Sequence, residues 1–166
     1  MSTLFATNDA ISSKEGKAFI NVEGVNEELF YATKVEAKVE KTKAEVKSVG
    51  RRMHGSKTVG MKGTGTLSIH SVTSMFNEMV AVYQRTGVDF YFNMTIIVED
   101  KTSTAGNQTL MLFNCNLDSV VLASFDATDD GVVTQEIPFT FDAFELLSRH
   151  TFSEAGTLAV IASQAL

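Results

Sequence analysis

Residues 29–70 of this 166-residue chain, "LFYATKVEAKVEKTKAEVKSVGRRMHGSKTVGMKGTGTLSIH", decide the fold. Their first part alternates with a period of two. One set of positions is mostly apolar, namely Leu29, Tyr31, Thr33, Val35, Ala37 and Val39. The other set is charged, namely Lys34, Glu36, Lys38 and Glu40. Because successive side chains of a strand point to opposite faces, the pattern predicts a strand with one covered face and one solvated face.

The alternation changes phase after Glu40. Lysine and glutamate then occupy odd positions, while Ala44 and Val46 occupy even ones. A β-bulge or a bend would produce this change. A helix over residues 35–48 is the competing interpretation, because its valines also suit helical spacing.

Residues 57–70 form a second extended stretch that contains three glycines. Gly60, Gly63 and Gly65 would weaken an interior strand, so they indicate bulges or a close approach of another part of the chain. The two stretches together predict a long basic hairpin, extended over about residues 40–65, with residues 50–56 near its tip.

The tip resembles a phosphate-binding P-loop, G-x-x-x-x-G-K-[ST]. Gly50 and Gly55 have the required separation, but Ser56 lies between Gly55 and Lys57. Such a loop also needs a helix directly after it, so that backbone N–H groups and the helix dipole converge on phosphate. The segment that follows is rich in glycine and threonine and is poor helix material. The pattern therefore does not indicate nucleotide binding.

Outward from the hairpin, residues 71–87 predict one helix. Its apolar side chains recur at helical spacing along one stripe, which comprises Val72, Met75, Phe76, Met79, Val80 and Tyr83. Ser71 or Thr73 suits the N-terminal cap, and Gly87 suits the position after the last turn. We expect the stripe to pack on a core rather than to bind a cofactor.

Three further segments, residues 88–100, 107–127 and 131–147, are rich in Val, Ile, Phe and Thr and are separated by turn sequences. Strands, one helix and then strands again predict an α+β domain with an antiparallel sheet. The tail, residues 153–166, is small and apolar, and it reads either as a short docked segment or as a mobile one.

Composition predicts one globular domain, residues 1–166. We expect neither a signal peptide nor a membrane span, because no basic start precedes an apolar run and no apolar stretch is long enough. One cysteine, Cys115, fits a reducing compartment.

The net charge of −6 is unevenly distributed. Residues 34–62 hold nine Lys and Arg against three Glu, whereas residues 63–166 hold three Lys and Arg against twelve acids. This basic island reads either as a polyanion site or as one half of a self-complementary contact. It lacks the interleaved aromatic residues that stack nucleic-acid bases.

The chain carries no recognisable catalytic or metal-binding pattern. His54, His70 and His150 are far apart, and Cys115 has no cysteine partner, so no metal-ligand spacing can be read. Asp129 and Asp130 before Gly131 read as a turn rather than a calcium loop. We expect no catalytic residue, no cofactor, no metal and no enzymatic activity.

Three long stretches carry a family resemblance. Residues 34–79, residues 85–127 ("RTGVDFYFNMTIIVEDKTSTAGNQTLMLFNCNLDSVVLASFDA") and residues 137–147 ("IPFTFDAFELL") closely resemble the tail tube proteins of contractile phage tails, in the PBSX-like, XkdM-like branch. The likeness covers about residues 15–148 and departs after Arg149.

The resemblance implies an antiparallel β-sandwich or open barrel, mainly β, with one flanking helix outside the sheet and a long hairpin. It also implies six-membered rings that stack into the hollow inner tube of a contractile tail or tail-like bacteriocin. The implied partners are a sheath, a tape-measure protein and a baseplate hub, with DNA only as passing cargo. The implied place is the virion tail, assembled in the host bacterial cytoplasm.

The charge pattern then predicts a contact between rings. We expect the basic side chains of the hairpin to dock on acids of the next ring, a head-to-tail arrangement that builds an open filament. The bases are Lys47, Arg51, Arg52 and Lys57, and the acids are Asp126, Asp129, Asp130 and Glu136. The solvated faces of the inner strands would line the lumen, with a net charge that the sequence leaves open. The alternative is a ring-forming tail terminator or adaptor, or a secretion-system tube component.

Overall fold

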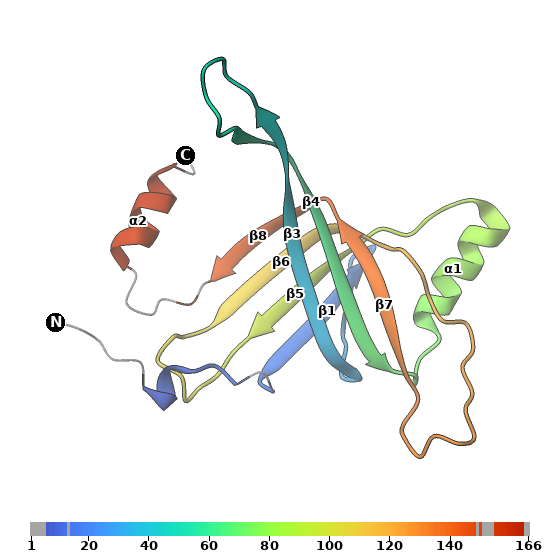
Figure 1. Cartoon of the computed structure of the whole chain (residues 1–166). Helices are drawn as coiled ribbons and strands as arrows, with labels where there is room; N and C mark the ends of the chain where they lie inside the picture. Colours follow the sequence, from blue (N-terminus) through green and yellow to red (C-terminus); the bar gives the residue numbers. More distant parts are fainter. Residues whose placement is uncertain (1–5, 13, 149, 151–154, 165–166) are drawn as a thin grey trace.

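The computed structural model describes residues 6–12, 14–148, 150 and 155–164. It contains eight strands and two α-helices among those residues (Figure 1). In chain order the elements are a short 3-10 helix, η1 (Thr7–Asp9), then β1 (Gly16–Val22), β2 (Val25–Glu28), β3 (Ala32–Val46), β4 (Gly55–His70), α1 (Met75–Thr86), β5 (Phe92–Val98), β6 (Gln108–Leu117), β7 (Thr134–Phe141), β8 (Ala143–Ser148) and α2 (Ala155–Gln164).

The strands form one antiparallel sheet system that is folded on itself. Its order is β2-β1-β5-β6-β7-β4-β3, and β8 pairs with β6 beside this path. β7 and β8 are nearly continuous, separated by Asp142, yet β7 pairs with β4 and β8 pairs with β6. At Asp142 the chain therefore passes from the half of the sheet that contains β4 and β3 to the half that contains β6, β5 and β1. The two halves cross each other as in an open barrel (Figure 1). The mainly β, antiparallel fold with one flanking helix is confirmed.

The core lies between the two crossing halves and under α1. Residues on one face of β4 and β7 supply much of it, in the strict alternation that a half-covered strand requires. The buried cluster comprises Ala18, Ile20, Leu29, Leu67, Ile69, Phe76, Phe92, Met94, Leu112, Cys115, Ile137, Phe139 and Phe141.

Helix α1 is shorter than the predicted helix over 71–87, because it begins at Met75. The Oγ1 atom of Thr73 accepts a hydrogen bond of 3.2 Å from the Met75 N–H, so Thr73 helps to satisfy the first turn. Gly87 has φ 72° and donates its N–H to the Tyr83 carbonyl, which confirms the predicted C-terminal signal. Only part of the predicted stripe faces the core: Phe76 is buried and Met79 packs beside it, whereas Tyr83 is exposed.

Three segments differ from the sequence expectation. The hairpin of β1 and β2 was not predicted. The extended segment predicted over residues 107–127 is wrong beyond Leu117, because residues 118–133 form a long loop. The tail forms α2, whose residues 160–164 are exposed. Residues 153, 154, 165 and 166 of that tail lie outside the described residues.

Candidate assembly surfaces

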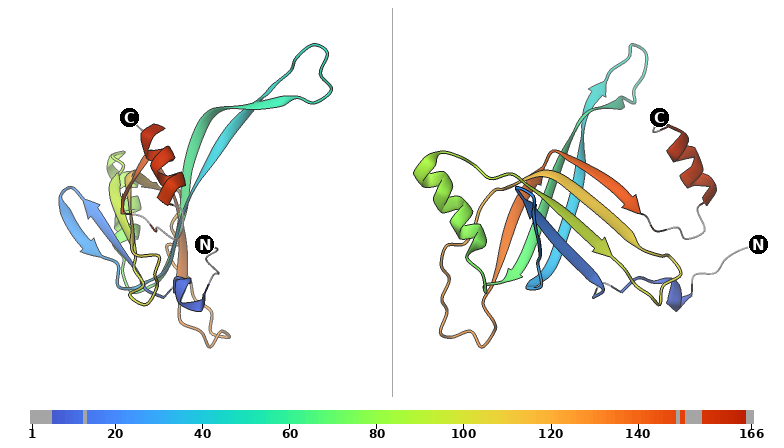
Figure 2. Two further views of the ribbon diagram at one scale, coloured as in Figure 1. Left: turned by 90° about the vertical axis from the view of Figure 1, so that its left-hand side faces the viewer. Right: turned by 180° about the vertical axis from the view of Figure 1, so that it is seen from behind.

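The hairpin of β3 and β4 projects far from the body of the protein. The two strands pair from Ala32 with Ile69 out to Val46 with Gly55, whereas β7 pairs with β4 only from His70 to Gly63. Residues 40–62 therefore extend as a free two-stranded ribbon, which we call the ribbon (Figures 1 and 2). At about 3.3 Å per residue, it extends roughly 25 Å beyond the sheet. The predicted long hairpin is confirmed, and the competing helix over 35–48 is wrong.

The ribbon contains the predicted irregularity. Thr42 pairs with Gly60 and Lys43 pairs with Thr58, so Val59 is an extra residue on β4. The bulge therefore lies on the partner strand and slightly beyond Glu40. It makes the ribbon twist and bend away from the sheet plane.

Two of the three glycines in β4 make room for aromatic rings. Gly63 lies opposite Phe141 and Gly65 lies opposite Phe139 in the register with β7. A Cβ atom at either glycine would come within 2.4 Å of the facing ring. The predicted close approach is confirmed at these two positions. Gly60 has open space around it and lies beside the bulge.

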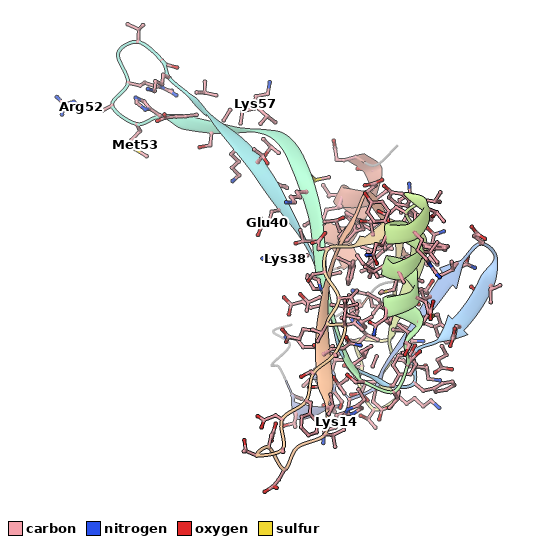
Figure 3. The ribbon with its side chains drawn as sticks, turned by 90° about the vertical axis from the view of Figure 1, so that its right-hand side faces the viewer. Lys14, Lys38, Glu40, Arg52, Met53 and Lys57 are labelled. Atoms are coloured by element: carbon pink, nitrogen blue, oxygen red, sulfur yellow. The ribbon has the colours of Figure 1, made fainter. Side chains whose placement is uncertain are left out.

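The basic side chains predicted for assembly are exposed on the ribbon. Lys47, Arg51 and Arg52 flank Gly50, whose φ is 82°, in the turn at the tip. Figure 3 shows Arg52 at the tip and Lys57 on β4. Among the described residues, Lys47 lies 3.9 Å from the Glu45 carboxylate, whereas no ion pair involves the other three. Residues 40–62 hold seven Lys and Arg against two Glu, a net charge of +5. The ribbon is therefore a strongly basic, exposed projection.

Three of the four predicted acids lie in the loop of residues 118–133, which we call the acidic loop. It contains four Asp and no Lys or Arg, a net charge of −4. The carboxylate of Asp126 accepts hydrogen bonds from the Thr128 hydroxyl and N–H, which lower its pKa. Asp129 accepts from the Gly131 N–H at 2.9 Å, confirming the predicted turn. These hydrogen bonds hold local turns in the loop, whose residues 121–133 are all exposed, whereas Val120 packs against the core.

The ribbon tip and the part of the acidic loop that precedes β7 lie at opposite ends of the molecule (Figures 1 and 2). β4 runs from the ribbon to His70, and His70 pairs with Thr134, the residue that follows the acidic loop. The 16 residues of β4 span about 50 Å. The structure therefore does not bring the predicted bases and acids together within one chain. Glu136, the fourth predicted acid, is exposed near the loop end of β7.

A third surface is the uncovered side of β3, β4 and β7, opposite α1, which we call the polar face. It presents threonine and serine hydroxyls together with three Lys and three Glu, a net charge of zero. The cross-strand register places on it Lys34, Glu36, Lys38, Glu40, Lys62, Thr64, Thr66, Ser68, Thr134, Glu136, Pro138 and Thr140. Figure 3 shows Lys38 and Glu40 on the side away from α1.

The charges of the polar face neutralise each other locally. Lys34 lies 3.3 Å from Glu36, and Lys38 lies 3.0 Å from Glu40. The hydrogen bond within the second pair raises the pKa of Lys38 and lowers the pKa of Glu40. Both groups therefore stay charged and paired near neutral pH.

The sheet also ends in unpaired edges. β3 is the last strand in its order and, among the described residues, pairs with β4 alone along its 15 residues. An edge strand of this length exposes a row of unpaired N–H and C=O groups that can hydrogen-bond to another chain. β2 and β8 provide the other edges, since each pairs with a single strand among the described residues.

The structure offers no separate chemical site among its described residues. Gly50 and Gly55 lie at the tip of a hairpin and are followed by β4, so no helix N-terminus faces the P-loop-like segment. No group of three or more His, Cys, Asp or Glu in the described part of the chain is arranged to hold a metal ion. Cys115 is buried, and burial raises its pKa to about 12, which makes it a poor nucleophile at neutral pH. Neither α1 nor α2, the two α-helices in the described residues, has the length and hydropathy that a membrane span requires.

The molecule is a structural β protein with surfaces for assembly. These surfaces are the long free edge of an open barrel, the polar face, and the basic ribbon opposite the acidic loop. Sequence comparison identifies the class. The profile described as phage tail tube protein matches residues 3–148. The chain is 39% identical over 138 residues to the phage-like element PBSX protein XkdM of Bacillus subtilis (strain 168), covering 83% of this chain and 90% of that relative. The chain belongs to the phage tail tube protein family and is a tail tube component.

Solved structures share this fold at low sequence identity. The six-fold symmetrised baseplate of the anti-feeding prophage contains a chain with a TM-score of 0.63 and 12% identity, covering 89% of this chain and 98% of that chain. The sheath/tube terminator of the PVC extracellular contractile injection system contains one with a TM-score of 0.67 and 18% identity, covering 86% of this chain and 100% of that chain. The tail tube fold expected from the sequence is therefore confirmed.

Proposed function

We propose that residues 1–166 act as a single domain that polymerises into stacked six-membered rings, forming the hollow inner tube of a contractile tail or tail-like bacteriocin. The observation that carries the proposal is the placement of the +5 ribbon and the −4 acidic loop at opposite ends of one chain. Complementary surfaces at opposite ends make a heterologous contact, which repeats without closing and so builds a filament. The protein acts by assembly, without catalytic residues or a cofactor.

Ring closure uses the free strand edges. The outer edge of β3 pairs with an edge strand of the neighbouring subunit, so that six open barrels join into a continuous one. Such closure removes the exposed edges that a β protein otherwise has to protect. Six-fold symmetry is supported by the similar fold in the six-fold symmetrised baseplate of the anti-feeding prophage.

The polar face lines the lumen in this assembly, and α1 lies on the outside. Its side chains are hydroxyls and paired charges, so it presents a wetted wall without a net attraction for polyanions. The tube then serves as a conduit for DNA, if the particle carries it, and for penetration of a cell envelope. The tape-measure protein lies inside, the sheath outside and the baseplate hub at the first ring. We place assembly in the host bacterial cytoplasm.

The stacking contact joins the bases of one ring to the acids of the next. The bases are Lys47, Arg51, Arg52 and Lys57, and the acids are Asp126, Asp129, Asp130 and Glu136. Arg51→Glu with Arg52→Glu should stop polymerisation and leave a folded monomer or single ring. Asp129→Lys with Asp130→Lys should do the same. Both pairs combined in one chain should restore tubes, because the two reversed surfaces match again.

Sedimentation velocity and electron microscopy measure the outcome. Arg85→Glu with Lys101→Glu is the control, since it makes the same change in net charge at positions outside the ribbon and the acidic loop. Normal tubes from the Arg51→Glu, Arg52→Glu variant would refute the assigned contact. A ring-forming terminator or adaptor is the second candidate, because the PVC sheath/tube terminator shares the fold. Wild-type rings that never stack would favour it.

A further inference from the structure

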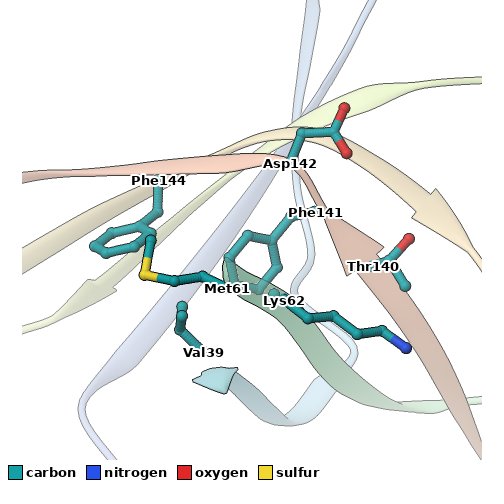
Figure 4. A pocket seen from close by; sticks show the side chains of 8 residues that line it. Val39, Met61, Lys62, Thr140, Phe141, Asp142 and Phe144 are labelled. Carbon is teal, nitrogen blue, oxygen red and sulfur yellow. The ribbon is translucent and has the colours of Figure 1, made fainter. Parts of the chain in front are cut away.

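An apolar hollow lies at the foot of the ribbon, where β3 and β4 leave the sheet (Figure 4). Its volume is about 290 Å³. Val39, Met61, Phe141 and Phe144 form its apolar side, and Lys62, Gly63, Thr140 and Asp142 complete the lining. Phe141 forms the buried floor, whereas Val39, Met61 and Phe144 are 37%, 64% and 44% exposed. Figure 4 shows the Met61 thioether extending toward the Phe144 ring. Neighbouring exposed apolar side chains around a hollow mark an interaction surface.

Two local features of the sequence produce this hollow. Gly63 has no side chain, so the Phe141 ring lies directly over the β4 backbone. β7 then changes direction at Asp142, and β8 carries Phe144 away from β4 toward β6. The ribbon and β8 diverge from this point, and the space between them remains unfilled by the described parts of the same chain. Lys62 lines the same hollow, and Lys41 lies opposite Met61 on the ribbon.

The acidic loop carries the complementary feature. Phe125 is 90% exposed, and Asp126 follows it directly. An enclosed apolar cavity of about 150 Å³ holds one benzene molecule, so the open hollow has room for one phenyl ring. Because the acidic loop lies at the opposite end of its own chain, Phe125 cannot reach the hollow of the same molecule (Figures 1 and 2). A second copy stacked end to end brings the two together.

We propose that the hollow receives the Phe125 side chain of the next copy in the tube. The proposal rests on the head-to-tail stacking described above and names its apolar anchor. The net charges of +5 on the ribbon and −4 on the acidic loop steer the approach. The buried Phe125 ring then supplies much of the affinity between stacked copies, as apolar anchors near the centre of an interface do.

Disulfide cross-linking tests which residues meet. Ser124→Cys keeps Phe125 in place, and Met61→Cys lies in the hollow. Oxidised tubes of the double variant should give a ladder of covalent multimers, because each chain then links to two different neighbours. Either single variant should give no ladder, since the native Cys115 is buried. Normal tubes without a ladder would overturn the anchor while leaving the tube intact.

The strength of the anchor is tested by truncating the ring. Phe125→Ser should raise the critical concentration for polymerisation at least tenfold, whereas Phe30→Ser, another exposed phenylalanine, should leave it unchanged. Equal effects of the two substitutions would overturn the proposal. A rapid disulfide within the monomer between Ala162→Cys and Met61→Cys would assign the hollow to the chain's own C-terminal helix instead. A wild-type chain that never forms tubes would refute the stacking itself, which is a distinct result.

Discussion

Gly65 is the position where a single added methyl group should cost the most. A Cβ there would lie 2.4 Å from Cζ of Phe139 and 2.7 Å from the Glu36 carbonyl oxygen. Phe139 is almost fully buried, and the carbonyl belongs to the paired strand, so neither neighbour can move freely. Overpacking of this kind costs about 1–3 kcal/mol. Replacing glycine by alanine also reduces the conformational entropy of the unfolded chain, which offsets this cost by about 0.4–1 kcal/mol.

Gly65→Ala should therefore destabilise the monomer by about 1–2 kcal/mol, which corresponds to a melting temperature lower by roughly 2–8 °C for a chain of this size. Gly60→Ala is the matched control on the same strand, because nothing lies within 4 Å of its Cβ position. It should be neutral or slightly stabilising. Urea unfolding, followed by circular dichroism at a concentration where the protein is monomeric, gives both free energies. Equal stabilities for the two variants would refute the close packing of Phe139 on Gly65.

Three further outcomes follow from exposure, burial and hydrogen bonding. In assembled tubes, Thr64→Cys on the polar face should react with a small maleimide but not with a bulky polymer-linked maleimide. Tyr83→Cys on α1 should react with both reagents. If the bulky reagent labelled the two variants equally, the polar face would lie on the outside of the tube. Native Cys115 should stay unlabelled at neutral pH until the chain unfolds, because burial raises its pKa to about 12, and fast labelling would contradict this. Hydrogen bonds from the Thr102 hydroxyl and backbone amides lower the pKa of Asp100. That stabilisation is present above the ordinary aspartate pKa of about 4 and is lost as pH falls through the lower folded value. Asp100→Asn should thus be less stable than wild type at neutral pH and similar at strongly acidic pH, and a constant difference in unfolding free energy would refute it.

The hairpin could be predicted because its inner half is covered on one side. Val35 and Ala37 are partly buried while Lys34 and Glu36 are exposed, which is the condition that produces a period of two in sequence. The glycines could be interpreted as sites of close approach, but the sequence did not identify their partners, Phe139 and Phe141. Those partners depend on the register between β4 and β7, two strands far apart in the chain.

The hairpin of β1 and β2 was missed because β2 gives almost no hydrophobic signal. Its four residues are exposed or nearly so, and it contributes little to the core. A signal was present in its turn, where Glu23 and Gly24 both have positive φ, as in a tight two-residue hairpin. Glu is not a usual residue in that position, so the turn did not stand out.

The acidic loop shows why the assembly surfaces could be predicted only in part. Its apolar residues, including Leu122 and Phe125, suggest a strand in the sequence, yet they are exposed in the single chain. Hydrophobic patterns report which side chains are to be covered, but not whether the same chain or another copy covers them. Charge asymmetry indicated a self-complementary contact. Only the fold places the two charged segments at opposite ends.

Negative-stain electron microscopy of the purified chain, concentrated in moderate salt, tests the central claim most directly. The account predicts long, uniform hollow tubes whose number rises with protein concentration. Rings that never stack, or monomers at every concentration, would contradict it.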